Sequence, residues 1–226
     1  MAEIVVALDL SVDGARRLLD RLPAARWVKV GAILFTSEGP AFIRELTGRG
    51  LKVFLDLKWH DIPNTVAGAV EGARDLGISM ATVHALGGVK MMEAAAKAAG
   101  PGLGVVGVTV LTSHDSAGFG SAVGREGVVV LEEVRRLARA ARKAGLRGVV
   151  CSPLEVGAVR GESGPGAWLV VPGIRRPGDP AGDQARTAGP GETVAAGATH
   201  LVVGRPIIHA ADPAAVFREM AAAGEG

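Results

Sequence analysis

The feature that most constrains the fold is a regular alternation of short apolar runs with Ala-rich stretches along the whole chain. The runs are almost continuously apolar, which is typical of parallel strands covered by helices. We expect strands at Ile4–Leu8, Val28–Val30, Lys52–Leu57, Met80–His84, Val105–Val110, Gly148–Cys151, Trp168–Val171 and His200–Val203. Eight strands alternating with helices predict a single (β/α)8 TIM barrel over residues 1–226, with an open doubly wound sheet as the alternative.

The stretches between these runs predict helices. We place them at Ser11–Arg21, Glu38–Arg49, Pro63–Leu76, Gly88–Ala99, Val128–Ala144, Pro153–Arg160 and Pro213–Ala222. The clearest apolar stripe lies on Val128–Ala144 and is formed by Leu131, Val134, Leu137 and Ala138. Two segments, Ser113–Gly127 and Pro172–Gly191, are expected to be loops, and a loop as long as the second is usually functional.

Composition excludes several classes of protein. The 226 residues carry a formal net charge of only +2 and contain no block of lysine or arginine, so nucleic-acid binding is not expected. No stretch approaches the ~18 apolar residues of a membrane span, and the first residues lack the layout of a signal peptide. Cys151, the only cysteine, follows Val149-Val150 and is expected to pack in the core. We therefore expect a cytoplasmic protein that binds neither membranes nor nucleic acid.

Charged and polar residues gather near the ends of the expected strands, where (β/α)8 barrels place their active sites. These residues are Asp9, Lys29, Asp56, Lys58, His84, Thr112, Arg175 and Arg205, the last of which follows Gly204. His84 suits a buried structural role better than a catalytic one. The loops after the seventh and eighth strands of barrels frequently bind phosphate, and arginine forms bidentate bonds with phosphate. Arg175 and Arg205 therefore predict a phosphate site.

The third strand carries the most informative pair. Because side chains alternate along a strand, Asp56 and Lys58 are expected to point to the same side. Charges inside a barrel mouth are costly unless they are paired, and these two residues alone would equally suit a structural ion pair. Lys29 and Asp61 favour a functional interpretation, since two carboxylates and two ammonium groups could form one alternating network. Neighbouring carboxylates would keep Lys58 protonated and available as an acid.

The run from Asp56 to Thr65 resembles the signature of the orotidine 5′-phosphate decarboxylases, and their bacterial branch in particular. Its pattern is Asp-x-Lys-x-x-Asp-Ile followed by Pro-Asn-Thr. Other segments resemble the family in the same order along the chain, namely Ala7–Asp9, Val28–Gly31, Val83–Ala85 with Gly87-Gly88, Val108–Ser113, Val171–Arg175 with Gly182–Gln184, and Val202–Ile207. The sequence departs from the family pattern at Trp59, at Gly189–Gly191 and over Ser113–Gly127. The matches nevertheless cover nearly all of the chain.

The resemblance implies removal of carbon dioxide from orotidine 5′-phosphate to give uridine 5′-phosphate in de novo pyrimidine biosynthesis, without a metal or cofactor. It implies that Lys58 donates the proton that replaces carbon dioxide at C6 of the pyrimidine. Asp56 would lie beside the departing carboxylate, and Lys29 and Asp61 would complete the charged network. The implied substrate contacts are Asp9, Lys29, Asp61 and Thr65 at the ribose, Thr112 at the pyrimidine, and Arg175, Gln184, Gly204 and Arg205 at the phosphate. A homodimer is also implied, in which Asp61 and Thr65 reach the neighbouring subunit's site.

Two other interpretations stay open. Sugar-phosphate decarboxylases and hexulose-phosphate synthases share a related Asp-x-Lys-x-x-Asp element, but they use magnesium and lack the continuation seen here at Ile62–Thr65. A phosphate-ligand sensor could keep the barrel and lose turnover, although intact Asp56, Lys58 and Asp61 argue against this. A magnesium requirement would favour the first alternative. Tight binding of uridine 5′-phosphate without decarboxylation would favour the second.

Overall fold

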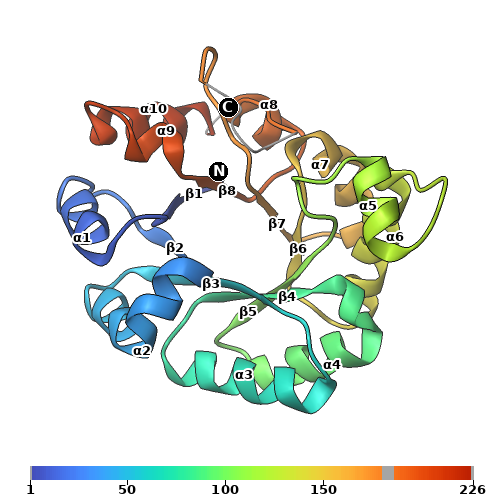
Figure 1. Ribbon diagram of the computed structural model, residues 1–226. Helices are drawn as coiled ribbons and strands as arrows, with labels where there is room; N and C mark the ends of the chain where they lie inside the picture. Colours follow the sequence, from blue (N-terminus) through green and yellow to red (C-terminus); the bar gives the residue numbers. More distant parts are fainter. Residues whose placement is uncertain (1, 180–185, 225–226) are drawn as a thin grey trace.

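Parallel strands close into a barrel, which confirms the expected (β/α)8 fold over the open sheet. The computed structural model describes residues 2–179 and 186–224. Its strands are β1 (Glu3–Ala7), β2 (Trp27–Gly31), β3 (Lys52–Trp59), β4 (Met80–His84), β5 (Gly104–Val108), β6 (Gly148–Val150), β7 (Trp168–Val171) and β8 (His200–Val203). Each strand pairs in parallel with the next, and β1 also pairs with β8 (Figure 1).

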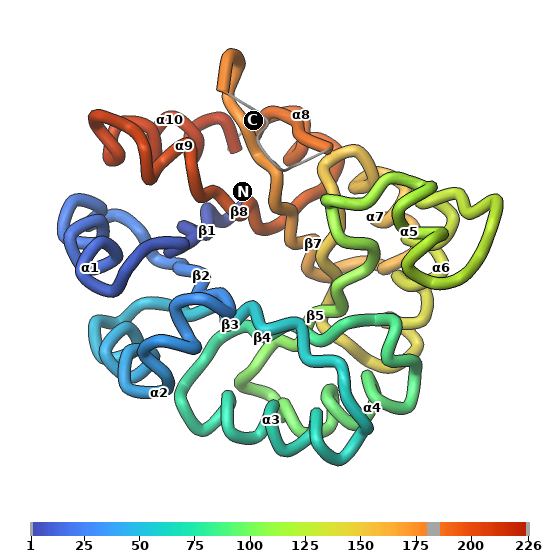
Figure 2. The backbone as a smooth tube through the Cα atoms, in the orientation of Figure 1, coloured from blue at the N-terminus to red at the C-terminus, as the bar shows by residue number. Residues whose placement is uncertain are grey.

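Helices surround the barrel as an outer ring (Figure 2). They are α1 (Val12–Asp20), α2 (Ala32–Gly48), α3 (Pro63–Asp75), α4 (Gly88–Ala99), α5 (Ser116–Val123), α6 (Val130–Lys143), α7 (Val156–Ser163), α8 (Pro190–Ala195), α9 (Arg205–Ile208) and α10 (Pro213–Ala223), with short 3-10 turns η1 (Ala85–Gly87) and η2 (Pro153–Glu155). The two ends of the described chain meet, because the Ala2 N–H donates to the Gly224 carbonyl at 3.5 Å. Within the described part, no helix is both long enough and apolar enough to cross a bilayer.

A side-chain cap explains the start of α1, and two other helices depart from expectation. The Ser11 hydroxyl caps α1 by accepting the Gly14 N–H at 3.3 Å. Helix α2 begins at Ala32 rather than Glu38, and Gly39 (φ 62°) kinks it just before Pro40. The segment Ser113–Gly127 was expected to be a loop, but it contains α5, which Asp115 caps.

The expected apolar stripe of α6 is wrong at one position. Leu131 is 40% exposed, whereas Glu133 is buried. Glu133 forms ion pairs with Arg125 at 2.7 Å and Arg136 at 2.8 Å. Two guanidinium groups thus offset the cost of turning a carboxylate inward, which a hydrophobic pattern does not reveal.

The interior of the barrel is filled at its N-terminal end by aromatic side chains. Trp27 and Trp168 meet edge to face with ring centroids 6.1 Å apart, and His200 packs against both. Gly104 leaves space for the ring of Trp168, and Gly148 leaves space for its main chain, since a Cβ at either position would overlap these atoms. Above this plug, which consists of Trp27, Trp168 and His200, lie five buried side chains, namely Val5, Phe54, Met80, Val106 and Val170. One end of the barrel is therefore closed, and a ligand can enter only from the other.

Candidate functional site

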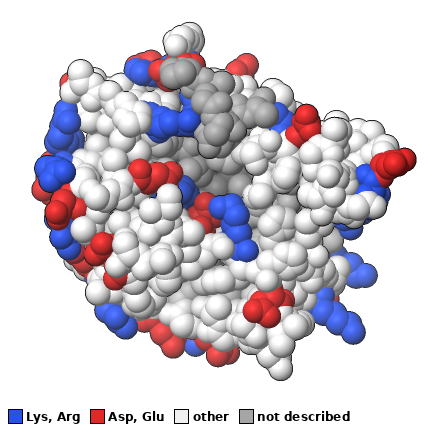
Figure 3. All heavy atoms as spheres, viewed as in Figure 1, with Lys and Arg blue, Asp and Glu red and all other residues white. Residues whose placement is uncertain are grey.

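A cavity of about 380 Å³ opens at the carboxyl ends of the strands. Figure 3 shows it as a central hollow with acidic and basic atoms exposed in its floor. It is lined by Ala7, Asp9, Lys29, Phe54, Asp56, Lys58, Val108, Val110, Leu111, Thr112, Ser113, Val150, Cys151, Pro172, Gly173, Arg175, Val202, Gly204, Arg205, Ile208 and His209. Every strand except β4 contributes to it directly or through the residues that follow. A volume of this size is typical of small-molecule sites.

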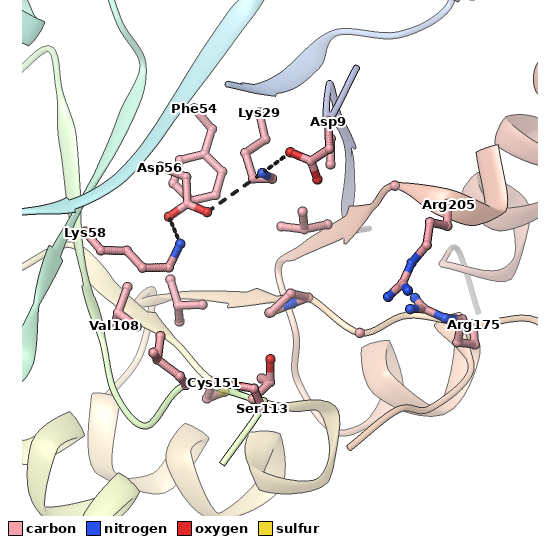
Figure 4. Close-up of a pocket in the computed structure, with 18 of the residues that line it drawn as sticks. Asp9, Lys29, Phe54, Asp56, Lys58, Val108, Ser113, Cys151, Arg175 and Arg205 are labelled. Atoms are coloured by element: carbon pink, nitrogen blue, oxygen red, sulfur yellow. Dashed lines mark hydrogen bonds and ion pairs between the residues drawn. The ribbon is translucent and has the colours of Figure 1, made fainter. Parts of the chain in front are cut away.

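Four charged side chains form an alternating row along one wall of the cavity (Figure 4). Lys29 Nζ lies 3.0 Å from Asp9 Oδ1 and 3.9 Å from Asp56 Oδ2. Lys58 Nζ lies 2.9 Å from Asp56 Oδ1. The side chains of Lys29 and Asp56 are only 11% and 13% exposed, so each offsets the desolvation of the other. The row is neutral as a whole and holds the Lys58 ammonium at its end, facing the cavity.

Asp56 and Lys58 of this row lie on β3, at a point where the pairing of β3 with β4 is irregular. The register is regular up to Leu55, opposite Ala81, and resumes at Trp59, opposite Val83. Between these points lies Lys58, the one non-glycine residue of the described chain with a positive φ, 52°. Asp56 and Lys58 share one side as expected, but the strand continues to Trp59 and does not follow simple alternation.

Two arginines face the charged row from the opposite wall. Figure 4 shows the guanidinium groups of Arg175 and Arg205 close together, with Lys58 and Asp56 across the cavity. Arg175 follows β7, is buried, and donates from Nη1 to the Ile174 carbonyl at 2.8 Å. Arg205 begins α9, directly after Gly204. Two planar cations side by side are suited to bind a phosphate.

Between the charged walls the cavity is largely apolar. Phe54, Val108 and Val202 contribute to this surface, and Thr112 and Ser113 add hydroxyl groups at its edge. Cys151 also lines the cavity, where burial raises the pKa of its thiol to about 12. A thiol of that pKa stays protonated at neutral pH and behaves as a small apolar group. This part of the lining therefore offers apolar contacts to a ligand.

His209 is a lining residue that sequence reasoning missed. It follows Arg205 by four residues across α9, and the two line the same cavity. That spacing puts two side chains on one face of a helix, so the signal was present in the sequence next to the eighth strand.

Asp61 and Thr65 do not line the cavity of their own chain. Both are exposed, and the Asp61 Oδ1 accepts the N–H of Ile62 at 2.6 Å. The expected network of two lysines with Asp56 and Asp61 is therefore wrong within one chain, where Asp9 takes the place given to Asp61. Gln184 lies outside the described residues.

His84 has the environment of a structural histidine. Its Nδ1 accepts the Leu86 N–H at 3.3 Å, and its ring stacks on His60 with centroids 5.6 Å apart. Burial, with smaller contributions from His60 and Lys58, lowers the pKa of His84 to about 4. The imidazole is consequently neutral at pH 7.

The segment that follows β7 is anchored to the cavity by Arg186. Its guanidinium forms an ion pair with Glu155, which is buried after β6. It also donates from Nη2 to the carbonyl of Leu111 at 3.1 Å. The loop expected at Pro172–Gly191 is thus tied to the residues after β5 and β6, which border the site.

A closed barrel with a charged cavity at the carboxyl ends of its strands is the architecture of a (β/α)8-barrel enzyme. Among the residues described, no group of three or more His, Cys, Asp or Glu side chains is arranged to hold a metal ion. Residues 2–220 match the model of the "Orotidine 5'-phosphate decarboxylase / HUMPS family".

Individual relatives agree with this match. An orotidine 5′-phosphate decarboxylase of Anaeromyxobacter sp. (strain K) is 52% identical over 97% of this chain and 96% of its own length. One of Halorhodospira halophila is 50% identical, covering 98% of this chain and 97% of its own. The crystal structure of the orotidine 5′-phosphate decarboxylase of Lactobacillus acidophilus superposes with a TM-score of 0.89 at 36% identity, over the whole of both chains. The chain belongs to the orotidine 5′-phosphate decarboxylase / HUMPS family.

Proposed function

We propose that this protein decarboxylates orotidine 5′-phosphate to uridine 5′-phosphate in pyrimidine biosynthesis. The observation that carries the proposal is the row Asp9–Lys29–Asp56–Lys58, which faces the pair Arg175 and Arg205 across the cavity. A nucleotide has a matching distribution of groups, with a phosphate at one end, a flat base at the other and a ribose between. Full-length relatives at about half identity carry the same activity in their names.

Lys58 supplies the chemistry at the base. The bond from C6 to the carboxylate breaks and leaves its electron pair on C6, while carbon dioxide departs as a neutral molecule. The ammonium of Lys58 stabilises this carbanion and then donates a proton to C6, and water returns a proton to the amine. Asp56 lies beside the departing carboxylate and fixes Lys58 through the 2.9 Å contact. No metal or cofactor takes part in this scheme.

The other wall binds the phosphate. Arg175, Gly204 and Arg205 hold it, and the resemblance to the family adds Gln184 to the phosphate contacts. Thr112 contacts the pyrimidine edge, and Asp9 and Lys29 contact ribose hydroxyls. The phosphate lies far from C6, so its binding energy contributes to the rate by holding the base against Lys58.

We further propose that the active form is a homodimer in which Asp61 and Thr65 enter the partner's cavity and complete its charged network and ribose contacts. Support comes from their exposure and from their absence from the lining of their own cavity. Ile33 and Ile62 are 81% and 66% exposed at the starts of α2 and α3. These helices follow the neighbouring strands β2 and β3, so the two isoleucines lie at the same end of the barrel. Exposed aliphatic side chains next to displaced site residues are what an intersubunit contact requires.

The activity is tested by mixing the purified protein with orotidine 5′-phosphate and a metal chelator, and following loss of the orotate absorbance in the ultraviolet. Lys58→Ala should abolish turnover and leave the fold intact. Lys52→Ala, at the opposite end of the same strand, is the matched control and should keep wild-type turnover. Well-folded wild-type protein that leaves the substrate unchanged would overturn the proposal. Sugar phosphates with magnesium would then be the next substrates to test.

The dimer is tested by mixing two inactive variants, Lys58→Ala and Asp61→Ala. If Asp61 acts in the partner's site, each mixed dimer regains one intact site, and random exchange restores roughly a quarter of wild-type activity. If Asp61 acts in its own chain, mixing restores nothing, and the intersubunit proposal fails while the decarboxylase proposal stands.

A further inference from the structure

Thr82 is a buried residue of β4 that lies behind the charged row without lining the cavity. Its exposed fraction is 0%. It lies beside the irregular part of β3. Between two paired positions, β3 advances by four residues, from Leu55 to Trp59, whereas β4 advances by only two, from Ala81 to Val83. The main-chain pairing of β3 with β4 is interrupted here. The Thr82 side chain of β4 forms a hydrogen bond with the irregular segment instead.

The Thr82 hydroxyl makes two hydrogen bonds whose directions are fixed by chemistry. The backbone N–H of Lys58 donates to Oγ1 at 2.8 Å. The single hydroxyl proton is then donated to Asp56 Oδ1 at 3.1 Å, because a carboxylate oxygen can only accept. The same Oδ1 accepts from Lys58 Nζ at 2.9 Å. Thr82, Asp56 and Lys58 therefore form a closed ring of three hydrogen bonds, which holds the lysine at both its main chain and its ammonium group.

Lys58 needs such support because of its backbone. At φ 52° it lies in the left-handed region, which non-glycine residues seldom adopt and which persists only where surrounding contacts enforce it. The Lys58 N–H bond to Thr82 is one of these contacts. Without it, the backbone can relax towards the extended conformation, and the side chain then leaves its contact with Asp56.

We infer that Thr82 is a positioning residue for the reaction, which holds Lys58 Nζ and Asp56 in the geometry that protonates C6. The inference rests on the proposed decarboxylase function and deepens it. Thr82 does not touch the cavity, so its effect is on the chemical step and not on the binding of the nucleotide. The segment of resemblance around the fourth strand begins only at Val83, and no role for Thr82 follows from it.

The test compares Thr82→Val, which keeps the shape and removes the hydroxyl, with Thr82→Ser, which keeps the hydroxyl. Hydrogen bonds to charged groups have a net strength that corresponds to a factor of about 10 to 100 in rate. We expect kcat of Thr82→Val to fall by about that factor, with KM and the inhibition constant of uridine 5′-phosphate changed less than about threefold. Thr82→Ser should recover kcat to within about threefold of wild type.

Thr109→Val is the matched control. Thr109 is equally buried on the neighbouring part of the barrel, but its hydroxyl donates to the Val150 carbonyl at 2.9 Å and not to the charged row. This variant should lose stability in urea and keep kcat. If Thr82→Val does not fold, Thr82→Cys, which offers only a weak hydrogen bond, takes its place with the same expected fall in kcat.

Three outcomes would overturn the inference. The first is wild-type kcat in the folded Thr82→Val protein. The second is an equal loss in Thr82→Val and Thr82→Ser, and the third is a loss carried by KM. Because wild-type protein is assayed alongside, an inactive wild type would instead reject the decarboxylase function itself.

Discussion

Acid should weaken the fold through His200, at the closed end of the barrel. Its ring packs against Trp27 and Trp168, with centroids 5.2 and 5.0 Å away. Burial, with smaller contributions from Lys52 and Arg147, lowers the pKa of His200 from 6.5 to about 4. Both of these cations sit over the indole rings, 5.3 and 5.1 Å from the centroids. The folded state therefore stabilises the neutral imidazole of His200 relative to its protonated form.

The size of the effect follows from proton linkage. In the unfolded chain a histidine takes up its proton near pH 6.5, whereas folded His200 does so only near pH 4. Because the folded pKa is the lower one, the contribution to stability is complete above the unfolded value and is lost as the pH falls towards 4. At pH 5 the loss amounts to ~2 kcal/mol, and over the whole range it approaches ~3.4 kcal/mol.

The assay is urea unfolding of the wild type and His200→Gln at pH 7.5 and pH 5. Glutamine remains neutral and can still bond to Thr199 Oγ1, which lies 2.8 Å from Nδ1 of the histidine. Other titrating groups, including His84, contribute equally to both proteins. The free energy of unfolding of the wild type should fall by ~2 kcal/mol more than that of the variant between the two pH values. Equal losses in both proteins would refute the assignment of acid sensitivity to His200.

Two further substitutions, the second with a matched control, test the proposed phosphate contact of Arg205 and the close packing of Gly148 against Trp168. Arg205→Ala should lower kcat/KM for orotidine 5′-phosphate by about 10- to 100-fold and leave the slow reaction of unphosphorylated orotidine unchanged; equal losses with both substrates would remove Arg205 from the phosphate site. Gly148→Ala should cost ~2 kcal/mol or more in urea unfolding, because its Cβ would overlap the main chain of Trp168. Gly157→Ala, on an exposed helix position with nothing within 4 Å, should instead stabilise by ~0.5–1 kcal/mol, and a similar cost in both would contradict the steric argument.

The strands were predictable because burial on both faces leaves a continuous apolar run, and each observed strand agrees with expectation to within two residues at either end. Helix α5 was not predicted, since two of its eight residues are glycine and two are serine, which have low helical propensity. It forms because Asp115 caps it, Gly124 ends it in a left-handed conformation and Phe119 is buried. The deciding contribution is tertiary packing, which no local pattern records.

At the site, the sequence predicted which residues meet but not how they are held. Polar residues at strand ends must converge in a barrel, so Asp9, Lys29, Asp56 and Lys58 could be assigned to one cavity in advance. The left-handed backbone conformation of Lys58 could not be predicted, because it depends on a shift in strand register and on Thr82, which is 24 residues away in the sequence. The sequence pattern did not predict that Asp9 is the second carboxylate of the row within one chain, whereas the resemblance already implied that Asp61 reaches the neighbouring subunit's site.

If Lys58 acts as proposed, the arrangement of charges makes its fixed position more important for the rate than the strength of any single ion pair. In the proposed reaction the substrate brings a carboxylate to the wall that contains Asp56, and on decarboxylation this negative charge moves onto C6. Interactions equal before and after that movement do not change the rate; only those that strengthen in the transition state do. In the proposed reaction the Lys58 ammonium, at the end of a row that is neutral as a whole, gains electrostatic attraction as charge arrives at C6, provided that it does not have to move. A ring of hydrogen bonds through Asp56 and Thr82 meets that condition, because the lysine is oriented before substrate arrives and needs no reorganisation during the reaction.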